Sequence, residues 1–181
     1  MNAFIEPPRN ISPLLRPGIW ISEKITGRAI LTARILALYP KAALGSGLLE
    51  SLVAHHDGKL DEQMLKLVRM AASFAAACPF CVDMNSYEQQ TLGIRVDEVL
   101  ALRGQLDLEN CASFSARERL AIQYTRLISQ TPLKFHPDFI AQIKASFDER
   151  EMVILASTAA QVNYWARLIQ ALGIPPAGFS E

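Results

Sequence analysis

The chain has 181 residues, half of them hydrophobic, and its 18 basic residues are balanced by 18 acidic ones. A chain of this length can bury a sizeable core within one domain. The balanced charge excludes the strong field by which proteins gather nucleic acid or an anionic membrane surface. We therefore expect a single domain with neither a nucleic-acid partner nor a membrane partner.

The N-terminal residues lack the basic and then apolar order of a signal peptide, and the chain has no run of about eighteen apolar residues that could span a bilayer. These features predict a cytoplasmic protein. Permanent structural disulfides are uncommon in a reducing compartment. Closely spaced cysteines in such a chain therefore favour redox chemistry or metal binding.

Residues 1–18 contain four prolines and show no helical or strand period, which predicts an extended arm ahead of a domain spanning 19–181. Beyond the arm, apolar residues recur mostly at helical spacing. Helices are expected, in chain order, at 20–38, 42–55, 60–77, 78–92, 96–103, 115–130, 136–147 and 149–172. No stretch alternates as a strand does. The predicted fold class is all-α, with seven or eight helices.

Several of these helices have recognisable start and stop signals. Asp61 is a good N-cap, and Ser115–Glu118 and Asp148–Glu151 have the spacing of a capping box. Gly93 and Gly173 favour the left-handed conformation that closes a helix. Pro40 is expected to end the first helix, His55-His56-Asp57-Gly58 to form a turn, and 107–113 to form a loop.

Two of the three cysteines lie in the motif Cys78-Pro79-Phe80-Cys81, between two predicted helices. Proline disfavours the helical conformation at the residue before it and suits the first position of a helix. Cys78 is thus expected at an N-cap and Cys81 in the first turn. A helix N-terminus favours an anion, so both positions increase the reactive thiolate form.

Asn85 lies four residues after Cys81, and therefore on the same helix face. Its amide can hydrogen-bond a sulfur or a bound water but cannot take a proton. Two other uses of the cysteines remain open. They could be small buried hydrophobic residues, or part of a metal site that recruits Cys111, His55, His56 or His136. No glycine-rich phosphate loop follows a strand, so no organic cofactor is expected.

The combination of motifs resembles the carboxymuconolactone decarboxylase superfamily, and within it the alkylhydroperoxidase D-like, peroxidase-related proteins. The matching features cover roughly residues 20–176. They are the helix 60–77 that leads into Cys78-Pro79-Phe80-Cys81, the segment Val82-Asp83-Met84-Asn85-Ser86, the Leu92-Gly93-Ile94 stop, the helix start at Phe114–Arg119, and Asn163 followed by Arg167. The resemblance implies a helical domain that forms homo-oligomers, with the cysteine pair near a subunit interface.

The resemblance also implies a reaction. Cys81 would attack a hydroperoxide as a thiolate, and Cys78 would resolve the resulting sulfenate as a disulfide. A thiol or dithiol reductant would then restore the pair. Family members of this kind use a histidine four residues after the second cysteine and a glutamate one helix earlier as a proton relay. This sequence has Asn85 and Lys66 at those places.

Lys66 has two interpretations. It could be a solvated lysine opposite the apolar stripe of its helix. Alternatively, the polar face that it shares with Arg69 and Ser73 could turn toward the cysteines, where a cation would lower a thiol pKa. Glu62, one turn earlier, is then a candidate base. Asp83 and Glu88 are further candidates, although Asp83 also suits the first turns of its helix.

We therefore expect a thiol-dependent redox protein that uses Cys78, Cys81, Asn85 and Lys66. A non-catalytic, redox-responsive or structural oligomer of the same fold is one alternative. A decarboxylase of the same superfamily is another, with Arg119 and Arg167 as candidate anchors for a carboxylate. In such a decarboxylase the cysteine pair would have no assigned function.

Overall fold

The computed structural model describes residues 3–53 and 57–179, and the regular structure in these ranges is helical apart from a single bridge between Asp57 and Leu60. The predicted all-α fold class is confirmed. Within the described ranges the α-helices are α1 (Arg16–Thr26), α2 (Leu31–Leu36), α3 (Pro40–Ser51), α4 (Glu62–Ala75), α5 (Pro79–Ser86), α6 (Val96–Leu102), α7 (Ala116–Ile128), α8 (Pro137–Ser146) and α9 (Glu149–Ala171). Two short 3-10 helices are η1 (Gln89–Leu92) and η2 (Leu108–Asn110), the latter inside the predicted loop 107–113.

Helix α4 is the central element, packed against α9, α7 and α5. It begins where predicted, because the Asp61 carboxylate accepts a hydrogen bond from the Met64 backbone N–H at 2.8 Å. Leu65, Leu67 and Val68 are completely buried. The strip that carries Lys66 and Arg69 is partly open to solvent. The polar strip of α4 therefore marks one face of the molecule.

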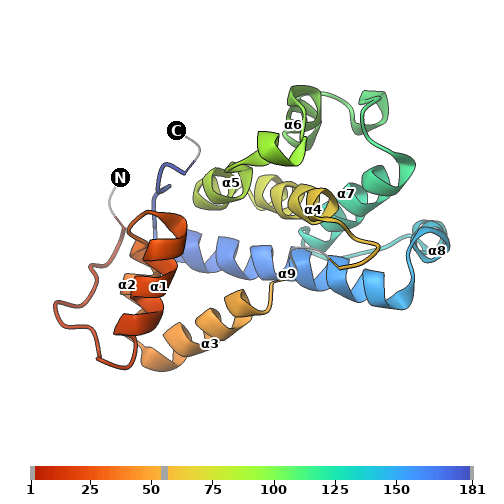
Figure 1. Ribbon diagram of the computed structural model, residues 1–181. Helices are drawn as coiled ribbons and strands as arrows, with labels where there is room; N and C mark the ends of the chain where they lie inside the picture. Colours follow the sequence, from red (N-terminus) through yellow and green to blue (C-terminus); the bar gives the residue numbers. More distant parts are fainter. Residues whose placement is uncertain (1–2, 54–56, 180–181) are drawn as a thin grey trace.

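Helix α9 is the longest element and runs across the molecule beside α4 (Figure 1). The predicted capping box at its start is present, since Asp148 and Glu151 each accept the other's backbone N–H at 2.9 Å. Its inner face holds the buried residues Leu155 and Ala159. The helix ends at Ala171 with Leu172 as its C-cap, and Gly173 follows with φ 64°.

The N-terminal region differs from the prediction of one helix over 20–38. The segment is divided into α1 and α2 by Gly27, whose φ of 65° closes α1 in the left-handed conformation. Helix α1 also begins at Arg16, so the helical chain starts within the predicted arm. Pro40 starts α3 instead of ending a helix, because a proline needs no N–H partner at the first helical position.

The helix that starts at the cysteine motif is shorter than predicted. It ends at Ser86, not near Leu92, because the Tyr87 carbonyl accepts a hydrogen bond from Lys66 Nζ at 2.6 Å. Glu88 then adopts φ 56°, and the chain continues as the 3-10 helix η1 to Gly93. A contact with another helix thus overrides the local helical pattern. None of the helices that the model describes is long and apolar enough to cross a membrane.

The core around α9 predicts a clear difference between two substitutions in that helix. Leu155 is completely buried, whereas Val153 is 66% exposed. Leu155→Ala is expected to lower the free energy of unfolding by about 2–5 kcal/mol, because it leaves a cavity. Val153→Ala, the matched control, should change it by less than about 0.5 kcal/mol. Denaturant titration monitored by circular dichroism measures both, and equal losses would contradict this assignment of the core.

Candidate functional site

The cysteine motif has the local geometry expected from the sequence. Cys78 is the N-cap of α5, Pro79 is its first residue, and Cys78 and Cys81 are joined as a disulfide with their Cα atoms 5.2 Å apart. The Cys81 backbone N–H donates to Cys78 Sγ at 3.2 Å. The Cys78 sulfur therefore occupies the position at which a helix N-terminus stabilises negative charge.

Both cysteines are buried within an apolar cluster. Cys78 is 0% exposed and Cys81 is 3% exposed. Their neighbours in the cluster come from both ends of the chain and from α9, and the buried members are Ile35, Ala76, Phe80, Ala166, Ile169, Ile174 and Phe179. Any reagent that reacts with this pair must therefore reach it through a movement of the residues that cover it.

A segment after α9, residues 174–179, lies against the start of α5, and we call it the C-terminal strap. The buried carboxylate of Asp83 accepts hydrogen bonds from the backbone N–H groups of Ala177 and Gly178, at 3.0 and 2.7 Å. The Phe179 ring meets Phe80 edge-on, with 6.3 Å between ring centroids. Asp83 thus holds the strap over the helix that carries the cysteines.

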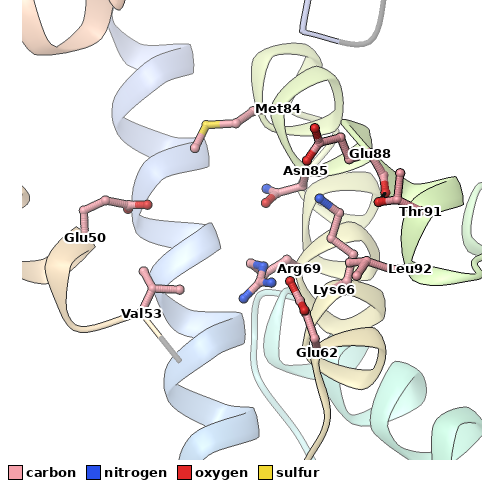
Figure 2. A pocket seen from close by; sticks show the side chains of 10 residues that line it. All are labelled: Glu50, Val53, Glu62, Lys66, Arg69, Met84, Asn85, Glu88, Thr91 and Leu92. Atoms are coloured by element: carbon pink, nitrogen blue, oxygen red, sulfur yellow. Dashed lines mark hydrogen bonds between the residues drawn. The ribbon is translucent and has the colours of Figure 1, made fainter. Parts of the chain in front are cut away.

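On another side of α5, a cavity of about 290 Å³ lies between α4, α5 and the end of α3 (Figure 2). It is lined by Glu50, Val53, Glu62, Lys66, Arg69, Met84, Asn85, Glu88, Thr91 and Leu92. The structure therefore brings together four of the predicted residues, Lys66, Asn85, Glu62 and Glu88. The two cysteines are not among the lining residues, although Asn85 lies one helical turn beyond Cys81.

The amide of Asn85 is held by α4. Asn85 Nδ2 donates to Ser73 Oγ at 2.9 Å, and Ser73 Oγ donates to the Arg69 carbonyl at 2.8 Å. The amide therefore has a fixed orientation at the wall of the cavity. It can position a ligand or a water molecule, but it cannot exchange a proton.

Lys66 is a partly buried residue in this wall. Burial lowers the pKa of its ammonium group, and the positive charge of Arg69 lowers it further. Glu88 and Glu62 act in the opposite direction. Burial also lowers the pKa of Arg69, while Glu50 and Glu62 raise it. The two cations therefore face the cavity in a partly dehydrated setting.

Sequence reasoning missed Glu50, which reaches the cavity from α3. Its carboxylate accepts hydrogen bonds from Trp165 Nε1 at 2.8 Å and Gln161 Nε2 at 3.3 Å, both on α9. These contacts fix the end of α3 beside the cavity. No local motif marks Glu50, because its role depends on how α3 packs against α9.

Asp83 and the third cysteine lie away from the cavity. Asp83 accepts hydrogen bonds from the strap and is not among the residues that line the cavity. Cys111 belongs to a different apolar cluster from the pair, and its sulfur lies 3.2 Å from Ser113 Oγ. The described part of the chain contains no group of three or more histidine, cysteine or acidic residues that could hold a metal ion.

The remaining candidates have other partners or lie outside the described ranges. His136 caps α8, and Arg119 donates to the Cys111 carbonyl at 3.0 Å. Arg167 is exposed on α9. His55 and His56 lie outside the described residues.

Comparison with known proteins places this geometry in a structural class. The debrominase Bmp8 superposes with a TM-score of 0.81 at 18% identity, over 99% of this chain and 96% of that one. The alkylhydroperoxidase AhpD core of a peroxidase-related protein from Ralstonia eutropha JMP134 gives 0.80 at 14% identity, over 97% and 93%. The chain has an alkylhydroperoxidase D-like fold. The resemblance read from the sequence is thus confirmed at the level of the fold.

Sequence comparison finds two uncharacterized relatives. The uncharacterized protein YnjA of Escherichia coli (strain K12) is 27% identical over 173 residues, which cover 95% of this chain and 93% of YnjA. The uncharacterized protein YdfG of Bacillus subtilis (strain 168) is 26% identical over 109 residues, 60% of this chain and 72% of YdfG. No family model matches the chain.

The strap on this alkylhydroperoxidase D-like fold predicts how fast the disulfide is reduced. Asp83→Asn keeps the shape of the side chain but removes the charge that strengthens its two hydrogen bonds. A loss of about 1 kcal/mol would make opening of the strap about fivefold more frequent. Dithiothreitol should therefore reduce the disulfide of Asp83→Asn faster than that of the wild type by the same factor. Thiol titration during the reaction measures both rates.

The matched control for this prediction is Asp61→Asn. That carboxylate also accepts a backbone N–H, but at the N-cap of α4, far in sequence from the strap. The disulfide of Asp61→Asn should be reduced at the same rate as that of the wild type. Equal rates in Asp83→Asn and the wild type would show that the strap does not limit access to the pair.

Proposed function

We propose that this protein is a thiol-dependent redox enzyme in which Cys78 and Cys81 reduce hydroperoxides. The observation that carries the proposal is the cysteine pair itself, joined as a disulfide at the N-terminus of α5 in an alkylhydroperoxidase D-like fold. A peroxidase-related structure with the same fold supports it. A cytoplasmic location would supply the thiol or dithiol reductant.

The proposed reaction balances with two electrons from the pair. The Cys81 thiolate attacks the terminal oxygen of the hydroperoxide, an S–O bond forms, the O–O bond breaks, and the alkoxide leaves and takes a proton to become an alcohol. The Cys78 thiolate then attacks the Cys81 sulfenic acid and displaces water, which forms the disulfide. An external dithiol restores both thiols by two exchange steps.

Lys66 and Asn85 supply the polar side of the proposed site. The ammonium group of Lys66 favours negative charge in the cavity beside α5 and can donate a proton to a leaving oxygen. Asn85, fixed by Ser73, can orient the hydroperoxide by a hydrogen bond. Glu62, which also lines the cavity, is the candidate that accepts a proton from a thiol when the reduced pair forms its thiolate again.

Replacement of each cysteine tests the proposal. Wild-type protein should consume cumene hydroperoxide in the presence of dithiothreitol, and Cys81→Ser should reduce turnover to the background of reductant alone. In the absence of dithiothreitol, pre-reduced Cys78→Ser should react once and stop, with one sulfenic acid per chain detectable by dimedone labelling and mass spectrometry. Cys111→Ser is the control and should retain full turnover.

A wild-type rate no higher than that of Cys81→Ser would exclude a peroxidase. The same dithiol supplies the electrons needed to replace a carbon–bromine bond by carbon–hydrogen with release of bromide. Because the debrominase Bmp8 shares this fold, a bromopyrrole is the second electron acceptor to test. Bromide release that depends on Cys81, without peroxide consumption, would assign the pair to dehalogenation.

The second candidate function is redox-responsive assembly, and the exposed face of α3 favours it. Leu44, Leu48 and Leu52 recur every four residues and are all exposed. Such an apolar stripe fits the homo-oligomer that the family resemblance implies. Sedimentation of the reduced and oxidised protein tests this idea: a change in mass that Leu48→Glu abolishes would support it, and a monomer in both states would exclude it.

A further inference from the structure

The C-terminal strap is held by polar contacts to its backbone. It leaves α9 and passes between α5 and the turn that joins α1 to α2 (Figure 1). On one side, Asp83 of α5 accepts the backbone N–H groups of Ala177 and Gly178. On the other side, Arg28 in the turn donates from a guanidinium nitrogen to the Ala177 carbonyl at 3.0 Å. Because backbone groups are common to all sequences, these contacts can hold other segments equally well.

The strap also has an aromatic anchor, Phe179, whose side chain is 5% exposed. Besides Phe80, its ring meets the ring of Tyr87, with 6.3 Å between centroids, and the guanidinium of Arg28, 5.8 Å from the ring centre. Phe179 and the two cysteines belong to the same apolar cluster. The aromatic ring therefore forms part of the apolar cover of the disulfide. We call the surface formed by Asp83, Phe80, Tyr87 and Arg28 the strap site.

The strap leaves unfilled space beside this surface. A second cavity, of about 360 Å³, lies between the strap, Phe80 and the α1–α2 turn. Its lining is mostly apolar and consists of Arg28, Ala29, Leu31, Phe80, Pro175, Pro176 and Ala177. The strap site can therefore accept a segment with larger side chains than those of the strap.

The contacts of the strap indicate what can replace it. When the strap leaves, Asp83 loses two hydrogen bonds, and the cluster around the cysteines loses the ring of Phe179. Water can restore the hydrogen bonds but not the apolar contacts. A second polypeptide segment can restore both, because it offers backbone N–H groups and can carry an aromatic side chain. The strap site thus favours a peptide segment as its alternative occupant.

We infer that the strap site is a peptide-binding site, in which the strap acts as an autoinhibitory segment. The partner is a protein dithiol that inserts an extended segment in place of the strap, with its reactive cysteine next to an aromatic residue. The aromatic residue takes the place of Phe179, which brings the adjacent thiol to the apolar cluster that contains the disulfide. The role as reductant rests on the proposed thiol chemistry, but peptide binding does not.

The exchange with this partner balances. A partner thiolate attacks one sulfur of the Cys78–Cys81 disulfide, the S–S bond breaks, and a mixed disulfide forms. The second partner thiolate then attacks the partner sulfur of the mixed disulfide and releases the chain. The partner loses two electrons and two protons, and Cys78 and Cys81 gain them.

The autoinhibitory role is tested with full chains whose strap is weakened. Phe179→Ala removes the aromatic anchor, so dithiothreitol should reduce its disulfide at least about tenfold faster than that of the wild type. Phe179→Leu keeps apolar bulk and should give a smaller increase, which serves the same tests if Phe179→Ala does not fold. Tyr39→Ala changes an aromatic residue that is 61% exposed and is the matched control. Equal rates in the wild type and both Phe179 variants would overturn the autoinhibitory role.

Peptide binding is tested by adding the strap sequence to Phe179→Ala. The peptide acetyl-Pro-Pro-Ala-Gly-Phe-amide has no thiol, so it should cover the disulfide and slow its reduction toward the wild-type rate in a saturable way. The same peptide with alanine in place of phenylalanine should have no effect. A segment tethered in the same chain has an effective concentration of order millimolar, so the titration extends to about 10 mM. Adding Asp83→Asn to this chain should weaken the effect, since a charged acceptor holds backbone N–H groups more strongly.

The partner class is tested with a dithiol joined to the same anchor. Acetyl-Pro-Pro-Ala-Gly-Phe-Cys-Gly-Gly-Cys-amide should reduce the disulfide of Phe179→Ala faster than the matched peptide with alanine in place of phenylalanine. Its rate should saturate with peptide concentration, whereas that of the alanine peptide should rise linearly. Equal rates with the two peptides would overturn the partner class.

The outcomes separate the inference from the proposed function. Saturable slowing by the thiol-free peptide, without peroxide turnover of the wild type, supports the strap site and rejects the peroxidase. Peroxide turnover with no effect of the thiol-free peptide supports the peroxidase and overturns the strap site. Slowing by the phenylalanine and alanine peptides alike, or slowing that Asp83→Asn leaves unchanged, also overturns the strap site.

Discussion

The break between α4 and α5 is the constraint on which the rest of the site depends. Ala77 adopts φ 47°, a left-handed conformation that costs a residue with a side chain about 1 kcal/mol or more. Pro79 then prevents Cys78 from continuing a helix. Together they end α4 and start α5 in a new direction. This reversal places Cys78 at an N-cap and returns Asn85 to the side of Ser73.

The break explains why the site has two different sides. At its first turns, α5 packs its cysteines and Phe80 into an apolar cluster that the C-terminal strap covers. One turn later it presents Asn85 to the polar strip of α4. Burial in apolar surroundings disfavours a thiolate, whereas the helix N-terminus favours it. The strap therefore covers the cysteine pair on one side of α5, and the cavity lies on another side.

The features that sequence predicted are those whose cause is local. Asp61, Ser115 and Asp148 cap helices through residues three positions away, and each cap is present in the structure. Cys78 and Pro79 fix the start of α5 by backbone sterics alone. The fold class follows in the same way from the apolar period of the helices.

The features that sequence could not predict arise from contacts between distant segments. Helix α5 ends early because Lys66 binds the Tyr87 carbonyl, and Glu50 reaches the cavity because α9 holds its carboxylate. Asp83 was assigned to its own helix start, but it binds a segment more than ninety residues away. Each case needs the tertiary arrangement, in which one polar group satisfies another across the chain.

Lys66 stands where the family resemblance leads one to expect a glutamate. This difference determines whether the side chain can accept or donate a proton in the proposed reaction. A carboxylate can accept the thiol proton, whereas an ammonium group can only donate until it has lost a proton itself. Burial and Arg69 both lower the pKa of Lys66, which eases donation to a leaving alkoxide.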